Sequence, residues 1–172
     1  MKSVLPIFLT ALFLTVTLTG CGTPVASCPK LGDKAPDFTL SGLDGKTTSL
    51  NSYSGKPVVI NTWDVNCIRC KEEMPFFQEL YNKYAQDQVV FISIDTGRDS
   101  TSSIKDYLKQ NNYTFNVLQD YGNKVFKPPY CFPEGNPCTV FIDSSGIIKY
   151  IKIGSFSTKQ ELDDTVLGLI GH

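Results

Sequence analysis

The 172-residue sequence contains a single histidine, His172, which is also its last residue. A zinc site with histidine ligands, a Ser-His-Asp triad and a Cys-His dyad are therefore poorly supported, because each needs a positioned imidazole. Positive charge is not in excess either, since 16 Lys and Arg stand against 17 Asp and Glu. We therefore expect no metal, no cofactor and no nucleic-acid partner, the last because that binding requires a concentrated basic surface.

The sequence also lacks a hydrophobic run that is clearly long enough to span a membrane. Residues 4–18 are apolar and nearly uncharged, and they follow a short start that contains Lys2. As a helix they would cover about 22 Å of the roughly 30 Å hydrocarbon core. This pattern is typical of an export signal, and a short N-terminal anchor helix remains the alternative.

The end of this run and the three residues after it, Leu18-Thr19-Gly20-Cys21, resemble a bacterial lipobox. The resemblance implies that residues 1–20 are a signal peptide and that Cys21 is lipidated after cleavage. Residues 21–30 then form a flexible tether and residues 31–172 one domain. The implied location is the extracytoplasmic side of a bacterial membrane, where disulfides can form and persist.

Residues 31–170 alternate between β-branched runs and amphipathic stretches. We expect strands at 38–40, 47–50, 57–63, 89–94, 114–118, 139–142 and 147–153, helices at 67–84, 102–110 and 158–170, and a helical turn at 121–126. Pro75 should kink the first helix. This order predicts an α/β fold with a central mixed sheet, helices on both faces, right-handed crossovers and an N-terminal β-hairpin.

Cysteine is the abundant reactive residue, with six in the chain. Cys67-Ile68-Arg69-Cys70 follows a predicted buried strand and begins a predicted helix. The helix N-terminus and Arg69 both favour the thiolate form of Cys67, which makes it the nucleophile. Cys70 lies one turn deeper and suits the resolving role, so we predict a redox disulfide between the two. Half of a zinc site and a structural disulfide are the alternatives.

The segment around this pair resembles a known family. Residues 61–75, NTWDVNCIRCKEEMP, resemble the active-site segment of the TlpA/ResA group of thioredoxin-like proteins, N-F-W-A-x-W-C-x-x-C-x-x-E-x-P. Further similarity lies at 32–40, 50, 55–57, 137–143 and 146, so it covers about 31–170. It implies a thioredoxin-like fold and thiol–disulfide oxidoreductase activity. Asn66 departs from the pattern, because the group has Trp beside the nucleophile.

Glu73 is the candidate for proton transfer. It follows Cys70 by three residues, one helical turn, and therefore shares its face. In the TlpA/ResA group the Glu at this position is buried beneath the active site, and a buried carboxyl has a raised pKa and can exchange protons with a thiol. The alternative is a solvated helix-face Glu, a description that fits Glu72 better. Asn61 stands where ordinary thioredoxins keep a buried Asp.

The resemblance also implies where a substrate binds. Pro137 corresponds to the cis-proline of the fold, whose loop lies against the C-x-x-C and lets a substrate backbone pair beside the disulfide. The backbone of Asn136 would then face the substrate. We expect Trp63, Asn66 and Arg69 to contribute to the same surface.

Three cysteines remain. Cys131 and Cys138 flank a Pro- and Gly-rich loop and have six residues between them. A disulfide there would stiffen the substrate loop and add about 2 kcal/mol of stability. Alternatively, Cys138 packs in the core as a small apolar residue. Cys28 is then either free or a competitor for one of these partners.

Our leading hypothesis is a monomeric, membrane-tethered thiol–disulfide oxidoreductase. The family implies reduction of disulfide-bearing exported proteins, with apocytochrome c as one class, and electrons from a membrane thiol carrier of the CcdA/DsbD kind. An oxidase or isomerase of the DsbA kind is the alternative. A peroxiredoxin-like peroxidase is less favoured. It needs a Pro and a Thr or Ser at fixed positions before the reactive Cys to bind peroxide, and this chain has Ile60 and Asp64 there. A Sco-like copper chaperone is also less favoured. That family uses C-x-x-x-C and a distant His, whereas this chain has C-x-x-C and only the terminal His172.

Overall fold

The computed structural model describes residues 28–85, 88–122, 125, 127, 130–132 and 137–171. Within them, seven strands form one mixed sheet in the order β2-β1-β5-β4-β3-β6-β7. The strands are β1 (Thr39–Gly42), β2 (Thr47–Ser49), β3 (Val58–Trp63), β4 (Val90–Asp95), β5 (Val117–Gln119), β6 (Cys138–Ile142) and β7 (Ile148–Ile153). The expected N-terminal hairpin is β1–β2, whose outer strand β2 is one edge of the sheet.

Three helices and a 3-10 turn complete the described elements: α1 (Ile68–Tyr84), α2 (Thr101–Asn111), α3 (Lys159–Ile170) and η1 (Leu50–Tyr53). Side chains cap their N-termini, as in α2, where the Ser100 hydroxyl accepts the Ser103 N–H at 3.1 Å. Pro75 lies inside α1, and the helix continues through it as one element. Of the turn expected at 121–126, residues 123, 124 and 126 lie outside the described residues.

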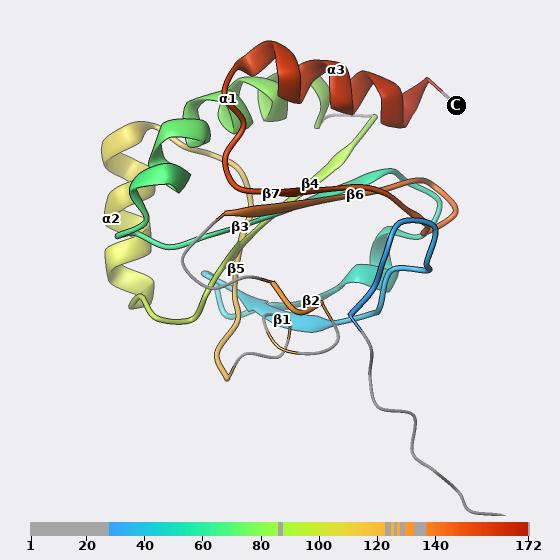
Figure 1. Cartoon of the computed structure of the whole chain (residues 1–172). Coiled ribbons are helices and arrows are strands. Elements are labelled where there is room, and N and C mark those ends of the chain that lie inside the picture. Colours follow the sequence, from blue (N-terminus) through green and yellow to red (C-terminus); the bar gives the residue numbers. More distant parts are fainter. Residues whose placement is uncertain are drawn as a thin grey trace, which may run out of the picture.

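All three described helices pack on one face of the sheet, which corrects the expectation of helices on both faces. Figure 1 shows α1 and α3 together on one side of the central strands and the β1–β2 hairpin on the other. The chain moves from β3 to β4 to β5 in one direction along the sheet, and two right-handed crossovers in one direction place α1 and α2 on the same face. The opposite face packs against the hairpin and against Tyr130 and Phe132.

Three loops meet at one end of the central strands. β3 and β4 are parallel, and Trp63 at the end of β3 pairs with Asp95 at the end of β4. β6 runs antiparallel to β3, so its first residue, Cys138, pairs with Thr62 near the end of β3. The C-x-x-C after β3, the loop after β4 and Pro137 before β6 therefore meet there. The register of the buried strands fixes this arrangement.

Gly97 shapes the loop after β4. It has a φ of +76°, and a Cβ placed there would lie 2.4 Å from the carbonyl oxygen of Asp120. We expect Gly97→Ala to lower the free energy of unfolding by about 3 kcal/mol or more, because it adds a backbone clash to left-handed strain. Gly122 is the matched control, with a φ of +88° and no atom within 4 Å of such a Cβ. Gly122→Ala should cost about 1 kcal/mol; equal losses in urea unfolding would contradict the clash.

Candidate active site

The two cysteines of the C-x-x-C form a disulfide, with their sulfurs 1.98 Å apart. Cys67 is the N-cap of α1, and its Sγ accepts the backbone N–H of Cys70 at 3.1 Å. An amide that points at this sulfur stabilises a thiolate, in line with the predicted nucleophile. Cys67 is half-buried, whereas Cys70 is only 2% exposed. An incoming partner can therefore reach Cys67 and not Cys70.

Carboxylates hold the loop that precedes Cys67. The backbone N–H of Val65 donates to Asp99 Oδ2 at 2.6 Å, and the N–H of Asn66 donates to Asp64 Oδ1 at 2.9 Å. Asp95 is fully buried next to them, and burial, followed by the charges of Asp99 and Asp64, raises its pKa. The loop before Cys67 is thus fixed by charge-assisted hydrogen bonds to carboxylates.

Glu73 is fully buried under the pair, on the face of α1 that also carries Cys70. Its Oε1 accepts a hydrogen bond from Asn61 Nδ2 at 3.0 Å, and its Oε2 accepts the backbone N–H of Phe156 at 2.9 Å. The Asn61 amide also donates to Thr139 Oγ1 at 3.1 Å. The expected buried carboxyl is therefore present, and α1, β3, β6 and the loop after β7 together position it.

Burial raises the pKa of Glu73 to about 7, and the two hydrogen bonds and the positive charge of Lys152 oppose this rise. A carboxyl with a pKa near neutrality can both accept and return a proton at physiological pH. Lys152 itself forms a half-buried ion pair with Glu161 at 2.5 Å. Glu161 also accepts the backbone N–H of Ser157 at 3.0 Å, so this pair fixes the loop that carries Phe156.

We expect Lys152→Met to raise the pKa of Glu73 further. The substitution removes the one positive side chain that lowers this pKa and frees the loop whose Phe156 N–H binds the carboxylate. The pKa is measured by following the ¹³C shift of the Glu73 carboxyl against pH. Lys149→Met on the same strand is the matched control, because Lys149 approaches Asp143, at 4.0 Å, and not Glu73. An unchanged Glu73 pKa in Lys152→Met would contradict the assigned role.

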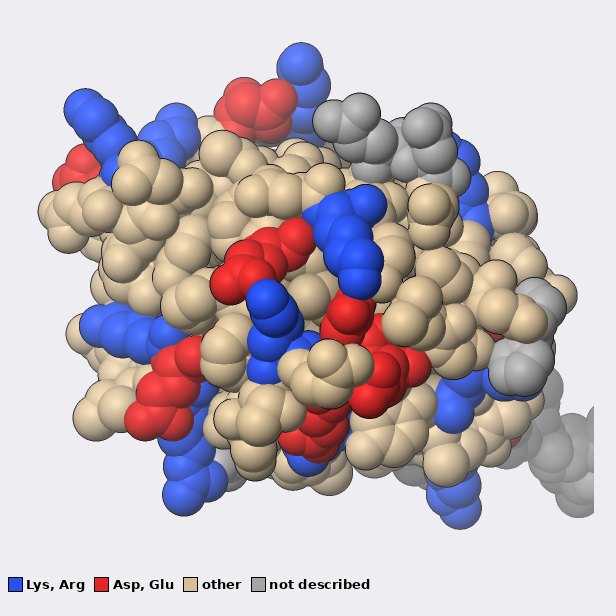
Figure 2. Space-filling model, turned by 90° about the horizontal axis from the view of Figure 1, so that it is seen from above, with Lys and Arg blue, Asp and Glu red and all other residues tan. Residues whose placement is uncertain are grey.

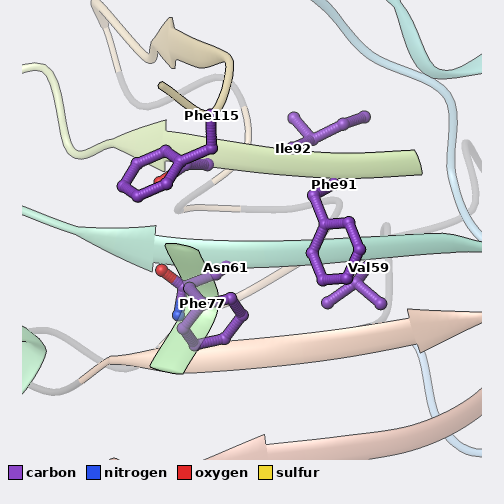
Figure 3. A pocket seen from close by; sticks show the side chains of 7 residues that line it. Val59, Asn61, Phe77, Phe91, Ile92 and Phe115 are labelled. Atoms are coloured by element: carbon purple, nitrogen blue, oxygen red, sulfur yellow. The ribbon is translucent and has the colours of Figure 1, made fainter. Parts of the chain in front are cut away.

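A small cavity lies behind Asn61, between β3, β4 and α1. Figure 3 shows the aromatic rings of Phe77, Phe91 and Phe115 around it, and Asn61 at its edge. Its volume is about 10 Å³, which is about the space that one water needs. A cavity of this size cannot admit a substrate, so the chemistry of the site takes place at the surface, where Cys67 is reachable.

The predicted substrate-contacting residues separate into two groups. Asn66 and Arg69 are exposed beside Cys67, as expected, and Ile68 between the cysteines is 75% exposed. Trp63 is 1% exposed and packs against Tyr107 at 5.6 Å, so the expectation that it touches a substrate was wrong. Alternation along β3 directs its side chain into the core beneath Cys70 and Met74.

The loop before β6 carries the remaining predicted substrate contacts. Pro137 is described and buried at the edge of the site, and its carbonyl accepts the N–H of Gly154 at 2.8 Å. Asn136 and the lipidation candidate Cys21 lie outside the described residues. Their roles stay predictions.

The possible Cys131–Cys138 disulfide is not formed, and the alternative, with Cys138 packed in the core and Cys28 competing for Cys131, is the one observed. Cys131 is bonded to Cys28, and Cys138 is a free, buried thiol. The physical reason is the start of β6, where the N–H of Cys138 donates to Thr62 Oγ1 at 2.9 Å and the Thr62 hydroxyl donates to the Cys138 carbonyl at 3.2 Å. This pairing turns the thiol into the core. Burial and the charge of Glu73 raise its pKa to about 12.

Charges of both signs are interspersed on the face that carries α1 and α3 (Figure 2). Ion pairs join the two helices, with Lys83 bound to Asp163 at 2.9 Å and Lys159 to Glu79 at 2.6 Å. Among the residues that the structure describes, no group of three or more His, Cys, Asp or Glu could hold a metal ion. Within the same residues, no helix is both long and apolar enough to cross a membrane.

Comparison with known proteins adds to this geometry. A family model described as the AhpC/TSA family matches residues 31–151, more than half of the chain. The chain belongs to the AhpC/TSA family. Within the family it is similar to the thiol-disulfide oxidoreductase ResA of Bacillus thuringiensis subsp. konkukian (strain 97-27), with 33% identity over 136 residues, 78% of this chain and 76% of ResA. It is a thiol–disulfide oxidoreductase of the ResA type.

Solved structures agree with the thioredoxin-like fold. A putative thiol:disulfide interchange protein DsbE from Chlorobium tepidum superposes with a TM-score of 0.73 at 24% identity, over 84% of this chain and all of that one. The pneumococcal exposed lipoprotein thioredoxin Etrx1 from Streptococcus pneumoniae strain TIGR4 superposes with a TM-score of 0.64 at 28% identity, over 78% of this chain and all of that one. The predicted fold class is confirmed.

Sequence reasoning missed part of the site. Asn61 was recognised as a substitution for Asp but not as a hydrogen-bond donor to Glu73. A usable signal was its place two residues before Trp63 on β3, because side chains two apart on a strand point to the same face of the sheet. Phe156 contributes only its backbone N–H, and Asp99 reaches Val65 from 34 residues away. No local pattern in the sequence marks either contact.

Proposed function

We propose that the chain is a membrane-tethered reductase of exported protein disulfides, with Cys67 as the nucleophile, Cys70 as the resolving cysteine and Glu73 as the proton-transfer group. The observation that carries this proposal is the asymmetry of the disulfide. Cys67 is reachable at a helix N-terminus, while Cys70 is buried on the face of α1 that carries a fully buried carboxyl. This is the arrangement that two-step disulfide exchange requires.

The reaction begins from the reduced pair. The Cys67 thiolate attacks one sulfur of the partner's disulfide, and the other sulfur leaves and takes up a proton. Glu73 then accepts the proton of the Cys70 thiol, and the Cys70 sulfur attacks Cys67 Sγ. The mixed disulfide breaks, the partner's sulfur leaves as a thiolate and takes up a proton from the solvent, and Glu73 returns its proton to the solvent. Two electrons have moved to the partner, and a membrane dithiol carrier restores the Cys67–Cys70 pair.

Electrostatics support the reducing direction. The carboxylates of Asp64 and Asp99 bind the two amides before Cys67, and Glu73 lies behind Cys70. Negative charge near a sulfur disfavours its thiolate. A protein whose reduced form is stabilised as a thiolate is a strong oxidant, so these carboxylates favour a reductant, while Arg69 beside Cys67 acts in the opposite sense. The helix N-terminus keeps enough thiolate at Cys67 for attack.

The tether and the partner class are supported by the leader pattern and by relatives. Residues 18–21 match a lipobox, and the similar Etrx1 is described as an exposed lipoprotein. Lipid on Cys21 would hold the domain on the extracytoplasmic side of the membrane. Exported proteins with exposed disulfides, including apocytochrome c, are then the substrates within reach.

The test is the direction of electron flow to a defined partner. The full chain in mild detergent is mixed with a C-x-x-C-H peptide, in separate reactions that start from the oxidised and the reduced peptide. We expect catalysed reduction of the peptide disulfide with dithiothreitol as electron source. Faster oxidation of the reduced peptide than reduction of the oxidised one would contradict the proposed direction.

A further inference from the structure

We propose that Cys28–Cys131 is a second thiol–disulfide exchange site, which the reduced C-x-x-C of a second copy of this chain opens while the domain stays folded. The bond joins residues 103 positions apart, with the sulfurs at 2.07 Å. The activity proposed for Cys67 and Cys70 makes no use of it. The inference rests on that proposed function, because it borrows the chemistry of the same dithiol.

The bond is open to attack from solvent. Cys28 is exposed and Cys131 is half-buried. Thiolate attack on a disulfide depends on access to a sulfur, so the exposed Cys28 Sγ is the reachable end. Leu31, three residues on, is itself 61% exposed. Cys138, in contrast, is buried with its pKa raised to about 12, which excludes it from exchange with this pair.

The Cys28 side of the bond can open without disturbing the sheet. The chain is first fastened to the sheet at Gly32, whose N–H donates to the carbonyl of Ile148 at 2.9 Å. Asp33 accepts the N–H of Ile148 at 2.9 Å, and Lys34 bridges to Ile147. The hydrogen bonds of Lys30 join it to Asp33 within its own turn. Within the part of the chain that the structure describes, residues 28–31 therefore form a short arm that the disulfide holds to the distant part of the domain.

The Cys131 side stays in place. The rings of its two neighbours, Tyr130 and Phe132, stack at 5.3 Å in the core, and the Tyr130 hydroxyl donates to the carbonyl of Pro36 at 2.7 Å. Cys131 lies between them with a φ of +55°, which turns it away from the core that its neighbours enter. Reduction thus leaves one thiol fixed by the core and one thiol on a short arm that precedes the first contact with the sheet.

This asymmetry makes the bond exchangeable. Two thiols held rigidly together re-form their disulfide at a very high effective concentration, whereas a short flexible arm provides one in the millimolar range. A dithiol with a C-x-x-C geometry can then compete for the sulfurs. Opening also moves the first fixed residue from Cys28 to Gly32, which lengthens the connection to the preceding chain by four residues, or up to about 14 Å.

The exchange balances between two copies of the chain. The Cys67 thiolate of the donor attacks Cys28 Sγ of the acceptor, and the Cys131 sulfur leaves as a thiolate and takes up a proton. Cys70 of the donor then attacks Cys67 Sγ, after it gives up its proton, and Cys28 leaves as a thiol. The donor ends with a Cys67–Cys70 disulfide and the acceptor with two thiols, so two electrons have moved, with one proton supplied by Cys70 and one by the solvent.

The test separates donor and acceptor by substitution. The donor is the full chain with Cys28→Ser and Cys131→Ser, fully reduced, and the acceptor is the full chain with Cys67→Ser and Cys70→Ser, oxidised at Cys28–Cys131. After acid quenching and alkylation, peptide mass spectrometry reports each pair. We expect one acceptor bond opened for each donor pair oxidised, at least about tenfold faster than with a Cys67→Ser donor, and an unchanged far-UV circular dichroism spectrum.

A model disulfide peptide distinguishes the possible failures. A donor that reduces the peptide but leaves Cys28–Cys131 intact overturns this inference and leaves the proposed function standing. A donor that reduces neither overturns both. Opening that is accompanied by loss of the circular dichroism signal also overturns it, because the bond would then be a structural one.

A second measurement needs no donor variant. The wild-type chain is equilibrated with dithiothreitol buffers, once folded and once in guanidinium chloride, and the Cys28–Cys131 population is mapped. We expect the two equilibrium constants to agree within roughly tenfold, because an arm at millimolar effective concentration resembles an open chain. A folded state that holds the bond more tightly by about a hundredfold or more would contradict the inference.

Discussion

Replacing Cys67 with Ser is expected to abolish disulfide reduction, with a loss of roughly a thousandfold or more in the rate of partner reduction. Cys67 is the only one of the pair that a partner can reach, since Cys70 is 2% exposed. An alcohol at the helix N-terminus is not ionised at neutral pH and cannot replace a thiolate as nucleophile. The rate is measured with an oxidised C-x-x-C-H peptide and dithiothreitol.

Cys70→Ser provides the complementary result. The Cys67 thiolate can still attack, but no buried thiol follows, so the covalent complex between Cys67 and the partner should accumulate and be visible by mass under non-reducing conditions. Cys138→Ser is the control, because this thiol is buried and belongs to neither disulfide. Accumulation of the complex in Cys67→Ser instead of Cys70→Ser would reverse the two assigned roles.

Glu73→Gln is expected to slow resolution of the mixed disulfide by about a hundredfold near pH 7 and to remove its pH dependence. The wild-type rate should rise through about pH 7, because burial raises the pKa of Glu73 to about 7 and only the ionised carboxylate can accept the Cys70 proton. The amide that replaces the carboxyl in this variant cannot accept a proton. The rate is measured by stopped-flow fluorescence of Trp63, which packs beside Cys70.

Glu72→Gln is the matched control for this experiment. Glu72 is the exposed neighbour on the same helix, so its substitution changes the net charge equally without reaching the buried pair. We expect its rate and inflection to match the wild type. A Glu73→Gln variant that retained the inflection near pH 7 would show that another group accepts the proton.

The sequence was most informative where one interaction dominates locally. The run before Cys67 is buried on both sides of the sheet, so β3 was found within one residue of its observed bounds. The helical spacing from Cys70 to Glu73 placed both on one face, and the structure confirms the buried carboxyl with its raised pKa. Local spacing determines the strand and the shared helix face, whereas the burial of Glu73 also depends on β3 and on the loop after β7 and was implied by the family resemblance.

Features that depend on distant contacts were not predictable. The strand expected at 114–118 is β5 at 117–119, because the N–H of Thr114 donates to Gln78 of α1 at 2.6 Å and not to a neighbouring strand. The sequence left the pairing of Cys131 open between Cys138 and Cys28, because no local pattern distinguishes the two. The register of β6 buries Cys138, and the fold brings Cys28 to Cys131 from 103 residues away.

The central claim, that Cys67–Cys70 is the redox pair of a reductant, is tested most directly by its midpoint potential. The full chain is equilibrated in glutathione and dithiothreitol buffers, and the state of this pair is read by alkylation and peptide mass. We predict a reversible two-electron transition near or below the roughly −270 mV of thioredoxin. A midpoint near the roughly −120 mV of DsbA would contradict the direction of electron flow, and the absence of a reversible transition would contradict the assignment of the redox pair.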